Sequence, residues 1–240
     1  STGYPKGVLS SHRNVLATLF SWALFFTVRS EMANVEKSDN STDKEKNISP
    51  SILHCVPLFH VTGSHAGFLM SVLSGRKMVL MSKWDAGLAL KLIQNEKITA
   101  ITGVPTQTWD LLNHPDRDKY DLSSLADLSG GGAPRPPEHV KRLNDEMDGR
   151  PSIGYGLSET NALGTLNAGD DYLKHPSSCG RAVPPVTDVG IVDQDWNFLN
   201  EGDHGEVVIK SPANMIGYWD NPDATDEVFN DEGWFKTGDL

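Results

Sequence analysis

The sequence predicts an α/β fold in which a parallel sheet is layered with helices and is followed by a smaller, β-rich part with the shape of a distorted barrel. Between Ile52 and Tyr155, short apolar runs alternate with helical patterns, which is typical of a parallel sheet covered on both faces. After about Pro176 the pattern changes to strands of two-residue alternation without a long helix between them. We therefore expect an α/β part over residues 1–176 and a β-rich part over residues 177–240.

The first fifty residues contain one expected helix and one polar segment. The mostly apolar stretch Ser11–Val28 predicts a helix. Residues 29–50 are dominated by Glu, Lys, Asp, Asn and Ser, with few apolar side chains. Such a composition buries too little apolar surface to fold by itself, so we expect a flexible insertion there.

Strands and helices then alternate to the middle of the chain. The expected strands are 52–56, 77–81, 98–102, 125–128 and 153–155. The expected helices are 64–73, 86–96, 106–112 and 137–147. In the second of these, Leu88, Leu92 and Ile93 share one face, and the last begins with prolines, which suit a helix entrance. In the β-rich part, 187–192 and 206–210 alternate like antiparallel strands, with turn residues between them.

Composition limits the partners and the compartment. The 240 residues carry a net charge of −11, whereas binding to a nucleic acid backbone needs an excess of Lys and Arg, so we expect no nucleic acid partner. Cys55 and Cys179 lie far apart, which predicts neither a disulfide framework nor a zinc site and favours a reducing, cytoplasmic compartment. The longest apolar stretch, Val15–Val28, is shorter than the roughly 20 residues of a membrane span. We therefore expect no transmembrane segment.

The chain opens on a loop suited to phosphate. Gly3 and Gly7 allow backbone N–H groups to approach phosphate oxygens, while Ser1 and Thr2 add hydroxyl donors. Lys6 adds a mobile positive charge. The spacing differs from that of the common Walker-type loop, and a plain surface turn is the alternative reading of these residues.

Two further motifs lie in the middle of the chain. Residues 130–134, Gly-Gly-Gly-Ala-Pro, follow a strand and leave room for a flat ring against the backbone. In residues 155–159, the Tyr155 ring can stack on a base, the Ser158 hydroxyl can contact a phosphate, and the Glu159 carboxylate can hold Mg²⁺. Taken alone, the first motif predicts an ordinary strand-to-helix turn and the second a helix start capped by Ser158.

Taken together and in this order, these motifs resemble those of the adenylate-forming (AMP-binding) superfamily, in its acyl-CoA synthetase or fatty acid–CoA ligase branch. The stretch Pro57-Leu58-Phe59-His60-Val61-Thr62-Gly63 also resembles the acyl-CoA synthetase pattern. The later motifs 179–184, 205–210, 217–218 and 233–239 follow the order of that family. Only the segment 29–50 falls outside the resemblance. The family usually has Thr where this chain has Ser158, an exchange that keeps the hydroxyl.

The resemblance implies a set of site residues. Catalytic roles fall to Lys6, Ser158 and Glu159, and Glu159 is the expected Mg²⁺ ligand. The implied nucleotide-binding residues are Ser1, Thr2, Gly3, Lys6, Gly7, Gly131, Gly132, Ala133, Pro134, Tyr155, Gly156, Ser158 and Asp239. The implied substrate-pocket residues are His60, Gly63 and Asn161. Asp239 corresponds to the family's ribose-binding carboxylate.

The resemblance also implies a reaction: a carboxylic acid, expected to be a fatty acid, reacts with ATP and Mg²⁺ to give an acyl-AMP, and the acyl group then passes to coenzyme A. Relatives continue past the Thr-Gly-Asp motif into a hinge and a mobile domain with a catalytic Lys, and this chain contains neither. We therefore expect the 240 residues to be a piece of a longer enzyme that binds nucleotide weakly and is inactive alone.

Three alternatives remain open. An amino-acid adenylation domain often has Asp where this chain has His60, which disfavours that reading. A luciferase-like oxygenase shares the fold and the adenylation step. A non-catalytic nucleotide- or acyl-binding module would keep the cleft without the reaction. Alkyl and aryl acids also both remain possible substrates.

Overall fold

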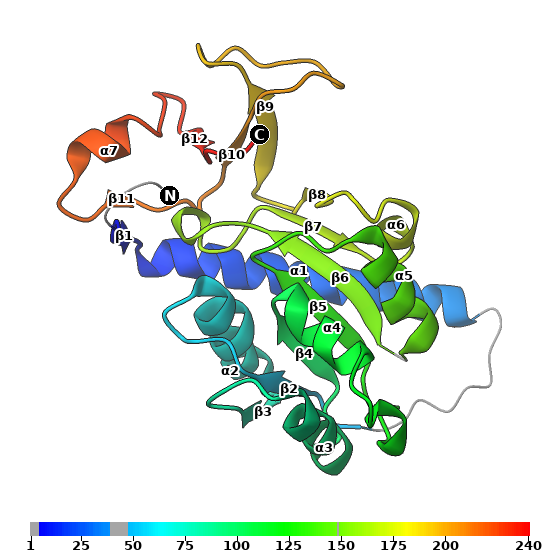
Figure 1. The fold of residues 1–240 in the computed structure, drawn as a ribbon. Coiled ribbons are helices and arrows are strands. Elements are labelled where there is room, and N and C mark those ends of the chain that lie inside the picture. Colours follow the sequence, from blue (N-terminus) through cyan, green and yellow to red (C-terminus); the bar gives the residue numbers. More distant parts are fainter. Residues whose placement is uncertain (1–4, 39–47, 148) are drawn as a thin grey trace.

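The computed structural model describes residues 5–38, 48–147 and 149–240, and its largest element is a seven-stranded sheet with the order β3-β2-β4-β5-β6-β7-β8 (Figure 1). The strands of this sheet are β2 (Ser51–His54), β3 (Lys77–Leu80), β4 (Ala100–Gly103), β5 (Asp127–Gly131), β6 (Arg150–Tyr155), β7 (Thr165–Ala168) and β8 (Arg181–Ala182). Neighbours from β3 to β6 pair in parallel, which confirms the predicted α/β fold.

The sheet differs from the prediction at one edge. Strands β7 and β8 were not predicted, and they extend the sheet in antiparallel fashion from β6. Because β8 lies at Arg181–Ala182, the large sheet continues past Pro176. The division of the chain into residues 1–176 and 177–240 stays a prediction.

Helices cover both faces of this sheet. They are α1 (His12–Ser38), the π-helix η1 (Thr62–Leu69), α2 (Met70–Ser74), α3 (Ala86–Glu96), α4 (Pro105–Leu112), α5 (Pro137–Glu146) and α6 (Asp170–Lys174). The chain also has the short 3₁₀ turns η2 (Arg117–Lys119) and η3 (Ser158–Thr160), and the short helix α7 (Pro222–Asp226), which packs against β11 (Gly217–Tyr218) away from this sheet (Figure 1). Neighbouring helices α3, α4 and α5 pack together on one face, while α1 packs with η1 and α2 on the other (Figure 1).

The main core lies between the sheet and the row α3–α4–α5. Its members are apolar and buried, and they include Leu53, Leu90, Ile93, Ile101, Leu128 and Leu143. Along β5, Leu128 and Gly130 are buried on this side, so the alternate residues Asp127, Ser129 and Gly131 face the side of α1. The face of the sheet toward α3, α4 and α5 is therefore apolar, and the face toward α1 carries the polar residues.

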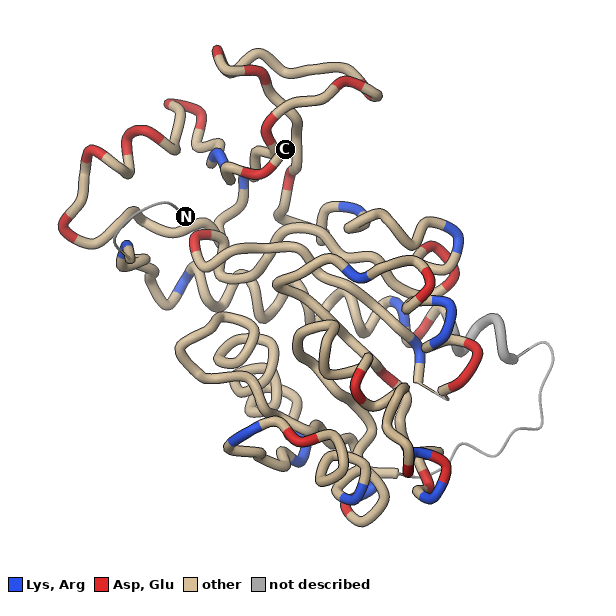
Figure 2. Tube along the Cα trace, in the orientation of Figure 1, with Lys and Arg blue, Asp and Glu red and all other residues tan. Residues whose placement is uncertain are grey.

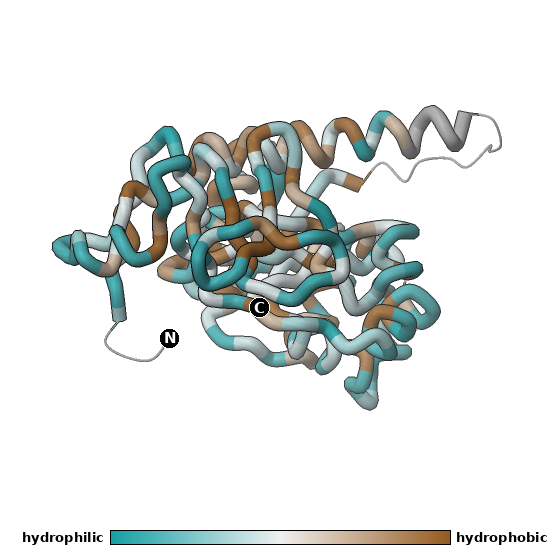
Figure 3. Tube along the Cα trace, turned by 90° about the horizontal axis from the view of Figure 1, so that it is seen from above, coloured by the Kyte–Doolittle hydropathy of each residue, from teal (hydrophilic) through white to brown (hydrophobic). Residues whose placement is uncertain are grey.

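Helix α1 is longer than predicted. It runs ten residues beyond Val28, so the first part of the segment predicted as an insertion is helical. The rest of that segment, residues 39–47, lies outside the described residues. Among the described residues, one stretch, His12–Met32, is long and apolar enough to span a membrane by these two criteria alone. In the structure, part of α1 covers a cavity, and brown, apolar segments recur along its length in Figure 3.

Two smaller antiparallel sheets complete the fold. The first pairs β1 (Val8–Leu9) with β11 (Gly217–Tyr218), and thus joins the opening of the chain to its late part. The second has the order β12-β10-β9, formed by β9 (Asp188–Val192), β10 (Glu206–Lys210) and β12 (Phe235–Lys236). Acidic residues recur along the loops of this region (Figure 2). The β-rich character predicted for the end of the chain is confirmed.

Candidate functional site

The opening loop is held by the pairing of β1 with β11. Val8 lies opposite Tyr218, and the N–H of Trp219 donates to the carbonyl of Gly7 at 2.7 Å. A Cβ atom on Gly7 would approach the Trp219 Cβ to 3.3 Å, so glycine permits this close contact. As a result, the ammonium of Lys6 lies 4.4 Å from the centroid of the Tyr218 ring.

The turn η3 after β6 carries Ser158 and Glu159 and is anchored to the same late segment. The N–H of Met215 donates to the carbonyl of Glu159 at 2.6 Å, and Asn161 Nδ2 donates to the carbonyl of Ala213 at 2.7 Å. Asn161 has a φ of 50°, in the left-handed region that Asn tolerates better than most residues. The predicted cap role of Ser158 is wrong, because the Thr160 side chain closes this turn by accepting from the N–H of Leu157.

Tyr218 links the two motifs. Its hydroxyl donates to Glu159 Oε1 at 2.8 Å, while its ring lies under the Lys6 ammonium. Burial raises the pKa of the Tyr218 hydroxyl, and the neighbouring Glu159 carboxylate raises it further, so Tyr218 stays a proton donor. A cation and a carboxylate from residues 153 positions apart are thus joined through one aromatic side chain.

A second tyrosine joins the middle motif to the end of the chain. The hydroxyl of Tyr155, at the end of β6, donates to Asp239 Oδ2 at 2.7 Å. Burial is the main cause that raises the pKa of Tyr155. The predicted stacking residue and the predicted ribose-binding carboxylate therefore lie side by side at the same end of the sheet.

A cavity of about 470 Å³ lies between the sheet and α1. At the end near η3 it is bordered by Gly131, Gly132, Gly154, Gly156 and Ala162. A Cβ atom on Gly156 would lie 2.5 Å from the backbone of Ala162, so only glycine fits at this position. The glycines leave backbone surface exposed to the cavity, as a flat ring or an extended chain requires.

Other predicted site residues lie elsewhere. Ser1, Thr2 and Gly3 fall outside the described residues. Ser158, Ala133 and Pro134 are exposed beside the nucleotide motifs. Two of the glycines predicted in the turn after β5, Gly130 and Gly131, belong to the strand itself, because the strand continues through Gly131.

The three predicted pocket residues do not border the cavity described above. His60 is exposed, whereas Gly63 and Asn161 are buried. Their neighbours Thr62 and Ala162 contribute to the lining instead. A Cβ atom on Gly63 would clash with the carbonyl of Pro57, so its role in the structure is the close packing of η1 on that loop. Pocket roles for these three residues stay predictions.

Comparison with known proteins identifies the family. The family model described as AMP-binding enzyme matches residues 1–219. This chain belongs to the AMP-binding enzyme family. Among its relatives, the long-chain-fatty-acid–CoA ligase of Bacillus subtilis is 35% identical over 241 residues, covering 100% of this chain and 40% of that protein. The feruloyl-CoA synthase of an Amycolatopsis species is 32% identical over 242 residues, covering 100% of this chain and 45% of that protein.

Solved structures of AMP-binding enzymes share the fold. The N-terminal domain of FACL13 from Mycobacterium tuberculosis superimposes with a TM-score of 0.81 at 29% identity, covering 99% of this chain and 55% of that one. The o-succinylbenzoate coenzyme A synthetase of Bacillus subtilis, in complex with AMP, has a TM-score of 0.80 at 25% identity, covering 99% of this chain and 44% of that one. The chain spans about two fifths of the length of the first curated relatives, 41% and 40%.

Reasoning from the sequence missed three residues that contact the predicted site residues, namely Tyr218, His65 and Ser10. Tyr218 was noted within a motif but given no role. His65 contacts Asn161 Oδ1 through Nε2 at 3.1 Å, and Asn161 Nδ2 donates to Ser10 Oγ at 3.0 Å. Burial is the main cause that lowers the pKa of His65, which favours its neutral form. In the sequence, only the Gly217-Tyr218 motif could have pointed to Tyr218. The contacts of His65 and Ser10 with Asn161 join residues that lie far apart in the chain, and no local pattern indicates them.

The donor set around Glu159 fits Mg²⁺ only with ligands from elsewhere. Among the described residues, no group of three or more His, Cys, Asp or Glu side chains is arranged to hold a metal. Mg²⁺ prefers few protein carboxylates together with phosphate oxygens and water. One carboxylate beside a cation therefore fits a metal that arrives with a polyphosphate.

Proposed function

We propose that the protein carrying this chain is an ATP-dependent acid–thiol ligase that converts a carboxylic acid to an acyl-AMP and then to an acyl-CoA. One observation carries the proposal: Lys6 and Glu159 both contact Tyr218, which brings a cation and a carboxylate together at η3, and Gly156 and Ala162 on either side of this turn line the cavity. The family and the names of its relatives, which are CoA ligases and synthetases, support the same reaction class.

In the first half-reaction, a carboxylate oxygen of the acid forms a bond to the α-phosphorus of ATP while the bond to pyrophosphate breaks. In the second, the sulfur of coenzyme A forms a bond to the acyl carbon and AMP leaves with the bonding electrons, as the thiol gives up its proton. The first step brings two anions together, so its catalysis depends on positioning and on neutralising charge.

The proposed roles fall on residues that lie near the carboxyl end of β6 or contact a residue there. Lys6 and the backbone N–H groups of the opening loop would hold the phosphates, and Ser158 would contact the α-phosphate. Glu159 would hold Mg²⁺, which supplies positive charge to the phosphate oxygens. Tyr155 would stack on the adenine beside the segment 131–134, and Asp239 would accept hydrogen bonds from the ribose hydroxyls.

The acid that we propose has a largely apolar body, as a fatty acid has. The wall of the cavity opposite the sheet supports this, since α1 and α2 contribute Trp22, Phe26, Met70 and Leu73. Cys55 and Cys179 are both free thiols, which supports a reducing compartment such as the cytoplasm.

The exchange of labelled pyrophosphate into ATP tests this function, because it needs the first half-reaction alone. In the full-length protein, we expect exchange that depends on an added acid and on Mg²⁺. Replacing the metal ligand by Glu159→Gln should lower the exchange rate at least about 100-fold, in the range found for removal of one group that stabilises transition-state charge.

Glu201→Gln is the matched control, because Glu201 is an exposed residue of a turn in the β-rich part. This variant should exchange at the wild-type rate. If no acid from a panel of alkyl and aryl carboxylates supports exchange, the proposed function is wrong.

A further inference from the structure

The floor of the 470 Å³ cavity changes character along the strands that form it. Register places Thr102 opposite Ser129, and Ser129 opposite Ser152, so one hydroxyl row crosses the three strands β4, β5 and β6. All three residues line the cavity. Two residues further toward the carboxyl ends, Gly131 lies opposite Gly154 and the floor consists of backbone.

At the amino end of the same strand face lies a carboxylate. Asp127 lines the cavity two residues before Ser129, on the same face of β5. Because a strand advances about 3.3 Å per residue, Asp127 lies roughly 13 Å from Gly131. The distance along the floor from Gly131 to this carboxylate is thus about that of an extended small-molecule chain.

Asp127 keeps capacity for a ligand. The Ser129 hydroxyl lies 2.7 Å from each of its carboxylate oxygens and 2.9 Å from the Ser152 hydroxyl. One hydroxyl proton can serve one carboxylate oxygen at a time, and a carboxylate has about four acceptor positions. A further donor entering from the cavity can therefore be accepted.

Arg76 supplies a cation at the same end. It lines the cavity and is fixed by the donation of its Nη2 to the carbonyl of Ala66 at 2.7 Å and of its Nε to Ser71 Oγ at 2.8 Å. The Arg76 and Asp127 charges interact: burial raises the pKa of Asp127, and Arg76, Arg135 and Arg29 each oppose that rise. A ligand carboxylate or ammonium at this end would meet one attracting and one repelling charge, so the pair of Asp127 and Arg76 favours neither sign of charge. A hydroxyl can donate to the first and accept from the second.

The geometry points to a specificity site for a hydroxyl group at the far end of the acid: Asp127, supported by the Thr102–Ser129–Ser152 row and by Arg76, selects acids whose apolar body ends in a hydroxyl. This inference rests on the proposed function, since it assumes that the carboxylate of the acid lies at the glycine end. It makes Asp127 a specificity-determining residue that contacts substrate far from the reacting atoms.

Matched pairs of acids test this inference in the full-length protein. Each pair differs only in the terminal hydroxyl: a straight-chain acid with its ω-hydroxy form, and cinnamate with 4-hydroxycinnamate. The readout is the ratio of kcat/KM within a pair, measured by pyrophosphate exchange. We expect the hydroxy acid to be preferred by roughly 10- to 100-fold, as for a hydrogen bond to a charged group.

Substitution of Asp127 then separates substrate contact from a structural role. Asp127→Asn keeps the shape and an acceptor oxygen, so the preference should fall but persist, whereas Asp127→Leu should abolish it. The readout in both variants is the ratio of kcat/KM within a pair, because an effect on the reaction that is common to both acids cancels in this ratio. Asp110→Asn is the control, since Asp110 accepts from Trp84 on the opposite side of the sheet and should leave the ratio unchanged.

The outcomes distinguish a failure of the proposed function from a failure of the specificity site. If no acid in the panel supports exchange, the proposed function is wrong. Exchange in which both members of each pair react equally well, or in which Asp127→Leu keeps the wild-type ratio, overturns the specificity site and leaves the function standing. A melting curve for each variant identifies a loss of folding, in which case Asp127→Asn alone decides.

Discussion

Tyr218 contacts both of the motifs that we propose to bind the phosphates and their metal ion. Its hydroxyl fixes the Glu159 carboxylate and its ring lies under Lys6, so one side chain orders two groups of opposite charge. Without Tyr218, the side chains of Lys6 and Glu159 would become ordered only when the ligand binds. The loss of their rotamer freedom would then weaken binding.

We therefore predict that Tyr218→Phe weakens binding of Mg·ATP by about 3- to 10-fold, as expected for the loss of a partly exposed hydrogen bond to a carboxylate. Tyr218→Leu should weaken it further, because the ring under Lys6 is also lost. Isothermal titration calorimetry on the full-length protein measures both. Tyr120→Phe, in the main core region, is the control and should bind as the wild type does. If Tyr218→Leu binds Mg·ATP with wild-type affinity, Lys6 and Glu159 do not need Tyr218 to bind the ligand.

His139 makes stability depend on pH. It is buried, with Nε2 3.2 Å from the Thr108 hydroxyl. Burial, followed by Arg135 and Arg142, lowers its pKa from 6.5 to about 4. The unfolded chain therefore takes up a proton before the folded one does, so this contribution to stability is complete above pH 6.5 and is lost between pH 6.5 and pH 4.

Urea unfolding at a series of pH values tests this sign. Between pH 6.5 and pH 4, the wild type should lose about 2–3 kcal/mol more than a His139→Gln variant, which has no group to titrate. The slope of the free energy of unfolding against pH is compared between the two proteins, so contributions from other histidines and carboxylates cancel. Parallel slopes for the two proteins would mean that His139 titrates alike in both states.

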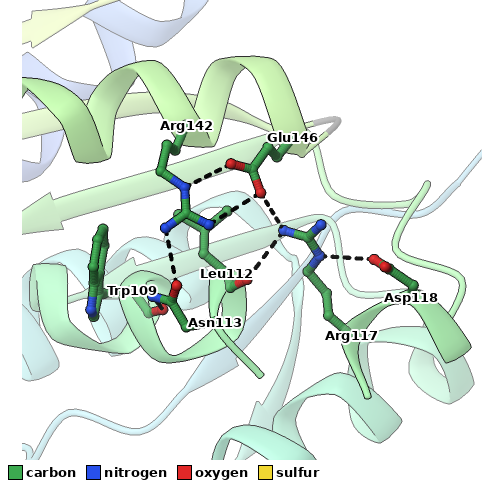
Figure 4. A network of polar contacts seen from close by, with 7 residues as sticks. All are labelled: Trp109, Leu112, Asn113, Arg117, Asp118, Arg142 and Glu146. Atoms are coloured by element: carbon green, nitrogen blue, oxygen red, sulfur yellow. Dashed lines mark hydrogen bonds and ion pairs between the residues drawn. The ribbon is translucent and has the colours of Figure 1, made fainter. Parts of the chain in front are cut away.

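At the scale of elements, a surface ion network joins α4, η2 and α5 (Figure 4). Glu146 of α5 accepts from Arg142 Nε at 2.7 Å and from Arg117 Nη1 at 2.8 Å. Arg142 also donates to Asn113 at 3.0 Å and stacks near Trp109, while Arg117 donates to the carbonyl of Leu112 at 3.2 Å. The network holds the ends of the helices over the main core.

We predict that Glu146→Gln slightly lowers the melting temperature at neutral pH, and that the difference disappears in acid. The hydrogen bonds from Arg142 and Arg117 lower the pKa of Glu146 from 4.5 to about 2, so its contribution is complete above pH 4.5 and lost as pH falls toward 2. Differential scanning calorimetry in low salt measures the difference. Asp145→Asn, on the same turn of α5, removes an equal charge and should have a smaller effect.

The π-helix η1 is an element that the local sequence did not predict. The apolar pattern predicted an ordinary helix over residues 64–73, and the chain does coil there. Arg76, however, donates to the carbonyls of Ala66 and Gly67 from beyond the end of α2, and so engages carbonyls that the helix would otherwise use. This contact joins residues about ten positions apart, so a local apolar pattern does not contain it.

At the scale of the whole molecule, the chain spans 40% of the Bacillus subtilis long-chain ligase that it resembles. We predict that the 240 residues alone support no pyrophosphate exchange above background and bind Mg·ATP more weakly than the full-length protein. The physical reason is that the proposed reaction would need further parts of the longer enzyme to exclude water and to complete the catalytic groups. Parallel exchange assays on both polypeptides measure this, and equal rates would contradict it.

The sequence by itself determined the fold class, the positions of most strands and helices, and the resemblance to the family. It could do so because apolar periodicity and glycine placement act over a few residues. Only the tertiary structure decided that β1 pairs with β11, that Tyr218 contacts both Lys6 and Glu159, and that Asp127 and Arg76 line the same cavity. These contacts join residues distant in the chain, and their partners follow from sheet register and packing, which local patterns do not contain.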